Sequence, residues 1–234
     1  MGLQVSGVKF SGIKSHHRGL ELVQVLHGSA FGSATLFTIP NYVDNTYLGI
    51  FVDYVATAYS AGGAPGWTTV TPVTNAGGDA MAYTWKILAV GDRGLNYTGG
   101  IYPTGVTNHR AQFYIFKTLN NSVITSVTSG NTFSVTNEVS IGTTTVNGTT
   151  VPSISGAQSA IVLHHFYDQA NALPPITSTP AMSLMRNTTN DYQGTQYAIY
   201  NPSTTMPASQ QVTHQRLLVA TASLDVITWF VVSY

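Results

Sequence analysis

Two adjacent histidines followed by an aspartate are the residues whose types best suit metal chemistry in this chain. His164 and His165 lie in the apolar run AIVLHHFY, and Asp168 follows three residues after His165. Imidazole and carboxylate groups are common zinc ligands, but successive residues of a strand point to opposite faces of its sheet. We therefore predict no metal site here, and interpret the pair as one buried, hydrogen-bonded histidine and one exposed histidine. His16-His17, in a Gly-interrupted segment, is interpreted as loop histidine.

Nucleophilic and acid–base chemistry have weaker candidates. Serine is abundant, but the chain has no Gly-x-Ser-x-Gly elbow. Most of the nine acidic residues stand beside Gly, Asn or Tyr in turns, whereas Asp53 lies inside an apolar run. We interpret Asp53 as a hydrogen-bonded structural carboxylate rather than as half of a glycosidase pair. The glycine pairs at 62–63 and 77–78 lack the lysine and helix of a phosphate loop. The sequence therefore predicts no enzyme and no cofactor.

The composition favours a protein that packs against other proteins. Charged residues make up 8% of the 234 residues, and nine basic and nine acidic side chains cancel, whereas ordinary domains hold about 25% charged residues. Such a surface is a poor partner for nucleic acid, which needs clustered Lys and Arg. No apolar run reaches the ~20 residues of a membrane helix. The chain has no cysteine, which fits assembly in a reducing cytoplasm. We expect a component of an assembly or of an extracellular particle, with no nucleic-acid or membrane partner.

The stretch from Gly62 to Asp92 predicts a β-hairpin that carries two tryptophans. Trp67 begins a strand rich in β-branched residues, Asn75–Asp79 is a Gly-rich turn, and a second strand follows from Met81. In that second strand Met81, Tyr83, Trp85 and Ile87 alternate with Ala82, Thr84, Lys86 and Leu88. The alternation predicts a sheet with one buried face.

The rest of the chain also reads as strands. Strands are predicted at 20–27, 34–39, 47–59, 108–119, 160–167, 181–186, 195–200, 212–220 and 226–234. Gly49 is predicted as a bulge or close-approach point, and 108–119 as a strand covered on both faces. Turns are predicted at Ser129–Asn131, at the Asn-Gly of Val146–Thr149, and at Ser223–Asp225. About a dozen strands without a helical period predict an all-β, antiparallel, jelly-roll-like sandwich.

We predict one domain, residues 20–234, preceded by an N-terminal arm, residues 1–19. The arm is apolar and basic, and its glycines interrupt any regular period. It is either a short edge strand of its own sheet or a segment that a neighbouring subunit buries by strand addition. The candidate interaction residues of the arm are Leu3, Val5, Val8, Lys9, Phe10, Ile13, Lys14 and Arg18.

Two segments of the hairpin region carry a family resemblance. Ala64-Pro65-Gly66-Trp67 is followed by Trp85-Lys86-Ile87-Leu88-Ala89-Val90-Gly91-Asp92, then by a strand with a basic start, Arg110–Lys117, and by a later strand, Ala160–Tyr167. This order resembles a pattern of tailed-bacteriophage virion proteins. The chain departs from that pattern by its arm and by a shorter lead into the Pro-Gly-Trp loop.

The resemblance implies an accessory structural protein of the virion, assembled in the cytoplasm of the bacterial host. We expect it to bind the outer capsid surface as a decoration or cement protein, with the major capsid protein or other virion proteins as partners. A homo-oligomer is expected, with a trimer favoured. The alternative is a tail-fibre or tail-tip adhesin that binds a host glycan or protein. Tyrosines that would stack on a glycan, or else pack in the core, are Tyr42, Tyr47, Tyr54, Tyr59 and Tyr102. A lectin or carbohydrate-active enzyme is a further alternative.

Overall fold

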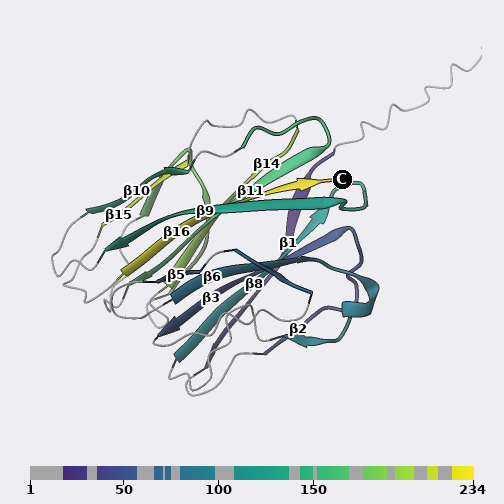
Figure 1. The fold of residues 1–234 in the computed structure, drawn as a ribbon, viewed down its shortest axis with the longest axis horizontal. Coiled ribbons are helices and arrows are strands. Elements are labelled where there is room, and N and C mark those ends of the chain that lie inside the picture. Colours follow the sequence, from purple (N-terminus) through teal and green to yellow (C-terminus); the bar gives the residue numbers. More distant parts are fainter. Residues whose placement is uncertain are drawn as a thin grey trace, which may run out of the picture.

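The structure is a computed structural model of an antiparallel β-sandwich (Figure 1). It describes residues 18–30, 36–56, 66–70, 72–74, 80–97, 108–136, 143–149, 152–168, 176–188, 193–202, 210–215 and 223–234. Within these ranges the single helical element is η1 (Val90–Asp92), one turn of 3-10 helix. Strands account for nearly all the remaining regular structure.

The first half of the chain forms one sheet, here named the N-terminal sheet. Its strands follow the order β1-β8-β3-β6-β4, and β5 also pairs with β6. They are β1 (Leu20–Ala30), β3 (Tyr47–Ala56), β4 (Thr68–Thr69), β5 (Val73–Thr74), β6 (Ala80–Ile87) and β8 (Asn108–Thr118). All pairs are antiparallel. The register of β1 shifts between Leu22 and Gln24, so Val23 is the extra residue of a β-bulge.

The second half forms the C-terminal sheet, in the order β13-β14-β11-β16-β9. Its strands are β9 (Ser126–Thr136), β11 (Gln158–Asp168), β13 (Ser183–Thr188), β14 (Gln193–Tyr200) and β16 (Ser223–Ser233). The segment 119–125 joins the two sheets, and Asn121 in it has a φ of 55°. Asparagine is among the residues that tolerate this left-handed conformation, which the turn after β8 requires.

Two smaller sheets complete the described strands. One is the pair β2 (Phe37–Thr38) and β7 (Asn96–Tyr97). The other has the order β10-β15-β12, from β10 (Thr143–Thr149), β12 (Ile176–Thr179) and β15 (Gln210–Gln215). β10 contacts β9 and β16, so this sheet extends the C-terminal half of the molecule.

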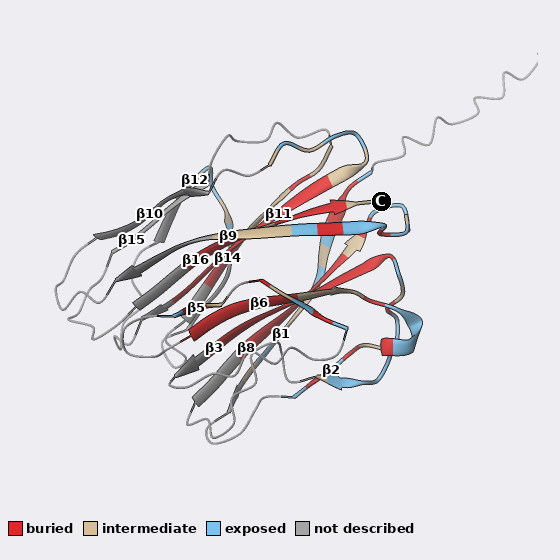
Figure 2. Ribbon diagram, in the orientation of Figure 1, coloured by how far each residue is buried: buried red, intermediate tan, exposed pale blue. Residues whose placement is uncertain are grey.

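The main core lies between the two large sheets (Figure 2). Tyr83 of β6 packs its ring 6.3 Å from the ring of Phe230 of β16, and its hydroxyl donates to the backbone oxygen of Val226 at 3.2 Å. Trp85 Nε1 donates to Ser129 Oγ of β9 at 3.1 Å. Side chains of both sheets share this core: Ile50, Val52, Tyr54, Met81, Tyr114 and Phe116 from one sheet, and Ile161, Leu163 and Val232 from the other.

The outer face of each large sheet is also buried. The β2–β7 ribbon covers the N-terminal sheet over Phe51, Trp67 and Phe113, whose rings contact one another at 4.2 to 6.1 Å between centroids. On the C-terminal sheet a third cluster gathers around Val162 and Ile227. Both sheets are therefore covered on two faces, which explains the long apolar runs of β3, β8 and β11.

These observations confirm the all-β antiparallel sandwich. The jelly-roll part of the prediction is not confirmed, because a jelly roll alternates strands between its two facing sheets, whereas all strands of the N-terminal sheet precede those of the C-terminal sheet. The prediction that 108–119 is covered on both faces is confirmed, since residues 111–116 are all buried. The alternation predicted for 81–88 is present, but the expectation of one buried face is wrong: Met81 and Tyr83 face the main core, and Leu88 faces the outer cluster.

The predicted turns at Ser129–Asn131, Val146–Thr149 and Ser223–Asp225 are wrong, because β9, β10 and β16 run through them. A Cβ on Gly130 would lie 2.6 Å from Trp229 Cζ2, so this glycine admits the indole of the neighbouring strand and does not mark a turn. In β10 the register shifts between Val146 and Thr149, so the Asn-Gly pair marks an irregularity within a strand. The predicted close approach at Gly49 is confirmed, because its Cβ would lie 2.9 Å from Phe113 Cε2.

Candidate functional site: an interaction surface at one end of the sandwich

The two adjacent histidines are both buried, which corrects the expectation that one of them is exposed. They do point to opposite faces of β11, as predicted. His165 faces the main core, whereas His164 lies on the face of the third cluster, around Val162 and Ile227, and stacks on Phe166 with ring centroids 5.7 Å apart. Both faces of the C-terminal sheet are covered, so neither imidazole is exposed to solvent.

A chain of hydrogen bonds ties His165 to the opposite sheet. His165 Nδ1 lies 2.8 Å from Thr195 Oγ1, and the Thr195 hydroxyl donates to Gln112 Oε1 of β8 at 2.6 Å. The Tyr114 hydroxyl donates to the same Gln112 oxygen. Because Thr195 uses its hydrogen on Gln112, the His165 Nδ1 must donate to Thr195. These four side chains are at most 1% exposed, so we assign them a structural role in joining the two sheets.

Asp53 lies in the other large sheet from the two adjacent histidines. Asp53 is fully buried in the middle of β3, opposite Ala82 and Ala111. Asp168 ends β11, and His16-His17 lies outside the described residues. The part of the chain that the structure describes holds no group of three His, Cys, Asp or Glu side chains suited to a metal ion. Its residues also include no helix that is long and apolar enough to span a membrane.

The segments that carry the virion-protein resemblance form one packed unit. Asp92 Oδ1 accepts hydrogen bonds from Lys86 Nζ at 2.5 Å and from the Tyr97 hydroxyl at 3.1 Å, and its Oδ2 accepts from the Ala89 N–H at 2.8 Å. The Tyr97 ring in turn packs edge-on against Trp67, at 5.3 Å. Burial alone would raise the pKa of the Asp92 carboxyl, but these hydrogen bonds and the charge of Lys86 outweigh it and lower the pKa. The motif therefore fixes the turn at 89–95 against the sheet.

The backbone conformation of Gly66 explains why the Pro-Gly-Trp loop has a glycine at this position. Its φ is +81°, a conformation that favours glycine. The residue directs Trp67 into the outer cluster, where the indole is 9% exposed. Gly66 also lies beside Lys86, since an added Cβ would be 3.7 Å from Nζ. The loop and the Lys–Asp pair thus belong to the same structural unit.

One end of the sandwich, here named the loop end, gathers three connections of the N-terminal sheet. These are the loops 40–46, 88–95 and 119–125, and hydrogen bonds join 40–46 to each of the other two. Arg93 Nε donates to the Val43 oxygen at 2.7 Å, and Ile124 N donates to the Asn45 oxygen at 2.9 Å. Segments far apart in sequence therefore present one surface.

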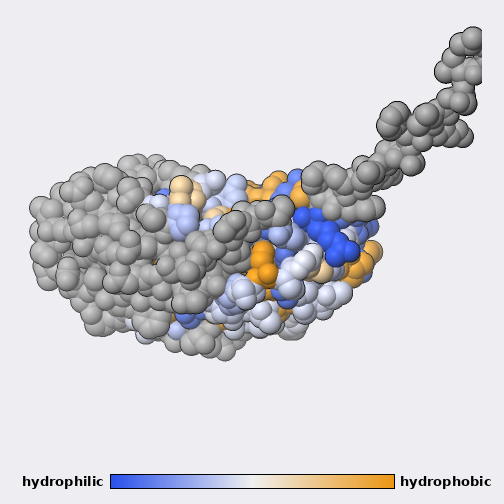
Figure 3. Space-filling view, turned by 90° about the horizontal axis from the view of Figure 1, so that it is seen from above, coloured by the Kyte–Doolittle hydropathy of each residue, from blue (hydrophilic) through white to orange (hydrophobic). Residues whose placement is uncertain are grey.

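The loop end exposes large apolar side chains. They range from 42% exposed for Leu119 to 59% for Val90. The set, here named the apolar rim, is Tyr42, Val90, Leu95, Leu119 and Val123. Figure 3 shows apolar (orange) patches on the described surface, set among blue and white residues. Exposed apolar groups gathered on adjacent loops are typical of a protein-binding surface.

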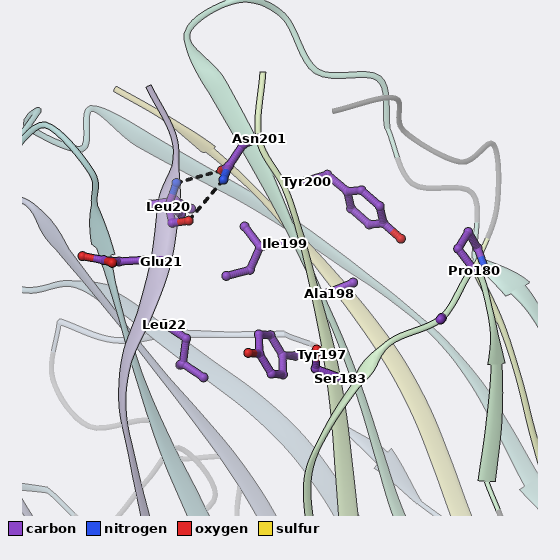
Figure 4. Close-up of a pocket in the computed structure, with 11 residues that line it drawn as sticks. Leu20, Glu21, Leu22, Pro180, Ser183, Tyr197, Ala198, Ile199, Tyr200 and Asn201 are labelled. Atoms are coloured by element: carbon purple, nitrogen blue, oxygen red, sulfur yellow. Dashed lines mark hydrogen bonds between the residues drawn. The ribbon is translucent and has the colours of Figure 1, made fainter. Parts of the chain in front are cut away.

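A groove opens beside the start of β1 (Figure 4). Its volume is about 530 Å³. Its lining combines apolar and aromatic side chains with polar groups: Leu20, Glu21, Leu22, Pro180, Ala181, Ser183, Tyr197, Ala198, Ile199, Tyr200 and Asn201. In Figure 4, Ile199 and Tyr197 of β14 point toward β1, whereas Glu21 points away from the groove. The groove therefore lies between the edge of the N-terminal sheet and the C-terminal sheet.

Asn201 closes one end of this groove. Its Oδ1 accepts the Leu20 N–H at 2.8 Å and the Ser159 hydroxyl at 2.8 Å, and its Nδ2 donates to the Leu20 oxygen at 3.3 Å. The Tyr234 hydroxyl lies 2.7 Å from Ser159 Oγ. The amide of Asn201 thus pairs with Leu20 as a neighbouring strand would, and ties the start of β1 to the C-terminal sheet.

Most predicted interaction residues of the arm lie outside the described residues. Those residues are Leu3, Val5, Val8, Lys9, Phe10, Ile13 and Lys14. Arg18 is described and exposed, and β1 begins at Leu20. Sequence reasoning did not find the groove or the apolar rim, because both depend on which loops the fold brings together.

The candidate tyrosines divide between core and surface. Tyr47 and Tyr54 are buried, whereas Tyr42 is exposed and packs 5.5 Å from the Tyr47 ring. Burial, followed by the neighbouring Tyr47, raises the pKa of Tyr42. Tyr59 and Tyr102 lie outside the described residues.

Comparisons with known proteins do not place the chain in a family. No family model matches it, and no curated protein matches it. Among solved structures, it is similar to the PBSX exported protein XepA at 8% identity and a TM-score of 0.20, over 91% of this chain and 86% of that chain. A TM-score this low carries no argument about fold or function.

Proposed function

We propose that this chain is a structural protein of a tailed-bacteriophage virion that binds the outer capsid surface as a decoration or cement protein. The observation that carries the proposal is the apolar rim on adjacent loops of a sandwich with very few charged residues. The resemblance of the Pro-Gly-Trp and Lys-Asp segments to virion proteins supports it. The partner is a protein surface of the particle, such as that of the major capsid protein.

The weak charge of the chain determines how such attachment would respond to salt. Nine basic and nine acidic groups leave no net charge, and the rim side chains are apolar except for the Tyr42 hydroxyl. Burial of apolar surface is not weakened by ionic screening, whereas exposed ion pairs are. We expect the protein to remain on its particle between ~0.05 and ~0.5 M NaCl, where such pairs become heavily screened.

Labelling of purified particles tests the location. Antibodies raised against the purified chain, detected with gold in electron micrographs, are expected to decorate the capsid at many regular positions. Val90→Asp should reduce rebinding to particles stripped of the protein, because it places a charge in the rim. Thr128→Asp, on the exposed face of β9, is the matched control and should rebind normally. Particles without label would overturn the virion assignment.

Tyr42 supports a second candidate, an adhesin of the tail. It is exposed at the loop end, and its ring could stack on a sugar, as aromatic side chains in glycan sites do. Its hydroxyl already donates to Gln24 Oε1 at 2.5 Å, so the ring face is the part left for a ligand. Label confined to the tail, together with glycan binding that Tyr42→Ala abolishes, would favour this function over capsid decoration.

A further inference from the structure

Among the described strands, β1 forms one edge of the N-terminal sheet. It pairs with β8 on one side, and no described strand pairs with its other side. Within the described residues, the Asn201 amide bonds both backbone groups of Leu20, at the start of this side of the strand. From Glu21 onward the strand extends to Ala30. An edge of this length is a template for strand addition unless something covers it.

Several side chains of this edge are apolar, although Glu21 and His27 are exposed. Leu22 and Val25 are half-buried against the main core, and Val23, the bulged residue, is 43% exposed. The groove next to them is lined in part by apolar residues of β14 and of the turn at Pro180–Ala181. An added strand would therefore find both backbone partners and a cavity for its side chains.

At the start of β1 the chain packs against the Asn201 amide, at the end of the groove. The Gly19 oxygen accepts the Leu119 N–H at 2.9 Å, which keeps residue 19 extended alongside the end of β8. A Cβ on Gly19 would lie 2.7 Å from Asn201 Cγ. The arm of the same chain would thus have to reverse direction around the Asn201 amide to reach the β1 edge.

The arm has the length and pattern of an added strand. Residues 1–17 precede the described part of the chain, and when extended they span up to about 55 Å, at roughly 3.3 Å per residue. Leu3 and Val5 share one face of an extended strand, as do Val8 and Phe10. Such a segment can reach a neighbouring molecule and place two apolar side chains at a time in the groove.

We propose that the outer edge of β1 and the groove beside β14 accept the N-terminal arm, residues 3–13, of a second copy of this chain. The acceptor site joins copies by strand addition, with backbone hydrogen bonds to β1 and apolar side chains in the groove. This deepens the proposed function by naming how subunits join. Its test uses the isolated protein in solution, so it can fail while the virion assignment stands.

Disulfide trapping in the full-length chain tests the proposal, because the chain has no cysteine of its own. One protein carries Val8→Cys in the arm, and the other carries Val23→Cys on the edge. They are mixed under oxidised glutathione, which accepts the two hydrogens that a disulfide releases. Arm docking would hold the thiols at roughly millimolar effective concentration, so at ~10 μM protein we expect linkage about 100-fold faster than in the control. The control replaces Val23→Cys with Thr128→Cys, on the exposed β9 edge.

Three results would overturn the proposal. Linkage no faster than with Thr128→Cys, also when Val5→Cys and Phe10→Cys replace Val8→Cys, would show that the arm does not dock at this edge. A double variant, Val8→Cys with Val23→Cys, that closes a disulfide within one chain at high dilution would show that the arm covers its own edge. A full-length protein that stays monomeric by light scattering at all concentrations would exclude a second copy.

Discussion

Replacing Gly49 with alanine tests the packing between the N-terminal sheet and the β2–β7 ribbon. The added Cβ would lie 2.9 Å from Phe113 Cε2, 3.1 Å from its Cζ and 3.2 Å from Leu88 Cδ2. Phe113 and Leu88 are fully buried in the outer cluster. Neither side chain can move into solvent, so the backbone or the ring must shift.

The magnitude follows from two opposed effects. Overpacking of a buried site costs about 1–3 kcal/mol. Alanine also narrows the conformational freedom of the unfolded chain, which stabilises the protein by about 0.4–1 kcal/mol. We therefore expect Gly49→Ala to lower the free energy of unfolding by about 1–2 kcal/mol, which lowers Tm by about 2–8 °C for a chain of this size.

Urea unfolding followed by circular dichroism measures the change, with Gly91→Ala as the matched control. Gly91 lies in η1, and nothing within 4 Å would meet its added Cβ. The control keeps the effect on the unfolded chain and lacks the clash, so it should leave stability unchanged or raise it by up to about 1 kcal/mol. If Gly49→Ala proves as stable as Gly91→Ala, the outer cluster is not packed as described.

Three further predictions concern the buried network, the Lys–Asp pair and catalysis. Thr195→Val should lower the free energy of unfolding by about 1–3 kcal/mol, because His165 and Gln112 each lose a buried partner. Thr195→Ser should restore most of that loss, and a valine variant of full stability in urea would contradict the network. Asp92→Asn should destabilise by about 2 kcal/mol at pH 7, where the carboxylate accepts charge-assisted hydrogen bonds from Lys86. The folded-state pKa of Asp92 lies below its ordinary 3.8, so its contribution is complete above that pH and falls as acid approaches the folded-state pKa. Acid titration of stability should therefore be shallower in Asp92→Asn than in wild type, and identical slopes would count against the pair. Assays of the pure protein on polysaccharides, esters and peptides should show no turnover, and activity lost on changing Asp53 or either adjacent histidine would refute this expectation.

Alternation along the chain predicted which residues of a strand share a face, but not that both faces are buried. The order of Met81, Tyr83 and Trp85 follows directly from a two-residue period. Gly49 was predictable as a close approach, since a glycine inside an apolar strand leaves room for a neighbour. Both signals are local, so they can be interpreted without knowing which strands pair with the segment.

Glycines next to polar residues led to wrong predictions of turns. Gly130 stands between Ser129 and Asn131, a sequence typical of a turn. In the structure it is a glycine because the indole of Trp229, on the paired strand, occupies the space that a Cβ would fill. That tryptophan is 99 residues away in sequence, so no local pattern reveals it. The burial of both His164 and His165 had a signal that was not used: the run AIVLHHFY is apolar on both faces, as in strands covered from two sides.

The motif that suggested a virion protein turns out to hold the fold together. Lys86, Asp92, Tyr97 and Trp67 bond or pack with one another, and they fix the turn that carries Val90 and Leu95. The motif thus anchors a loop, whereas the exposed residues on that loop take no part in the anchoring. We therefore propose that the binding specificity of the suggested virion protein resides in the apolar rim and in the β1 groove, and we expect substitutions there, not in the motif, to separate attachment to a particle from folding.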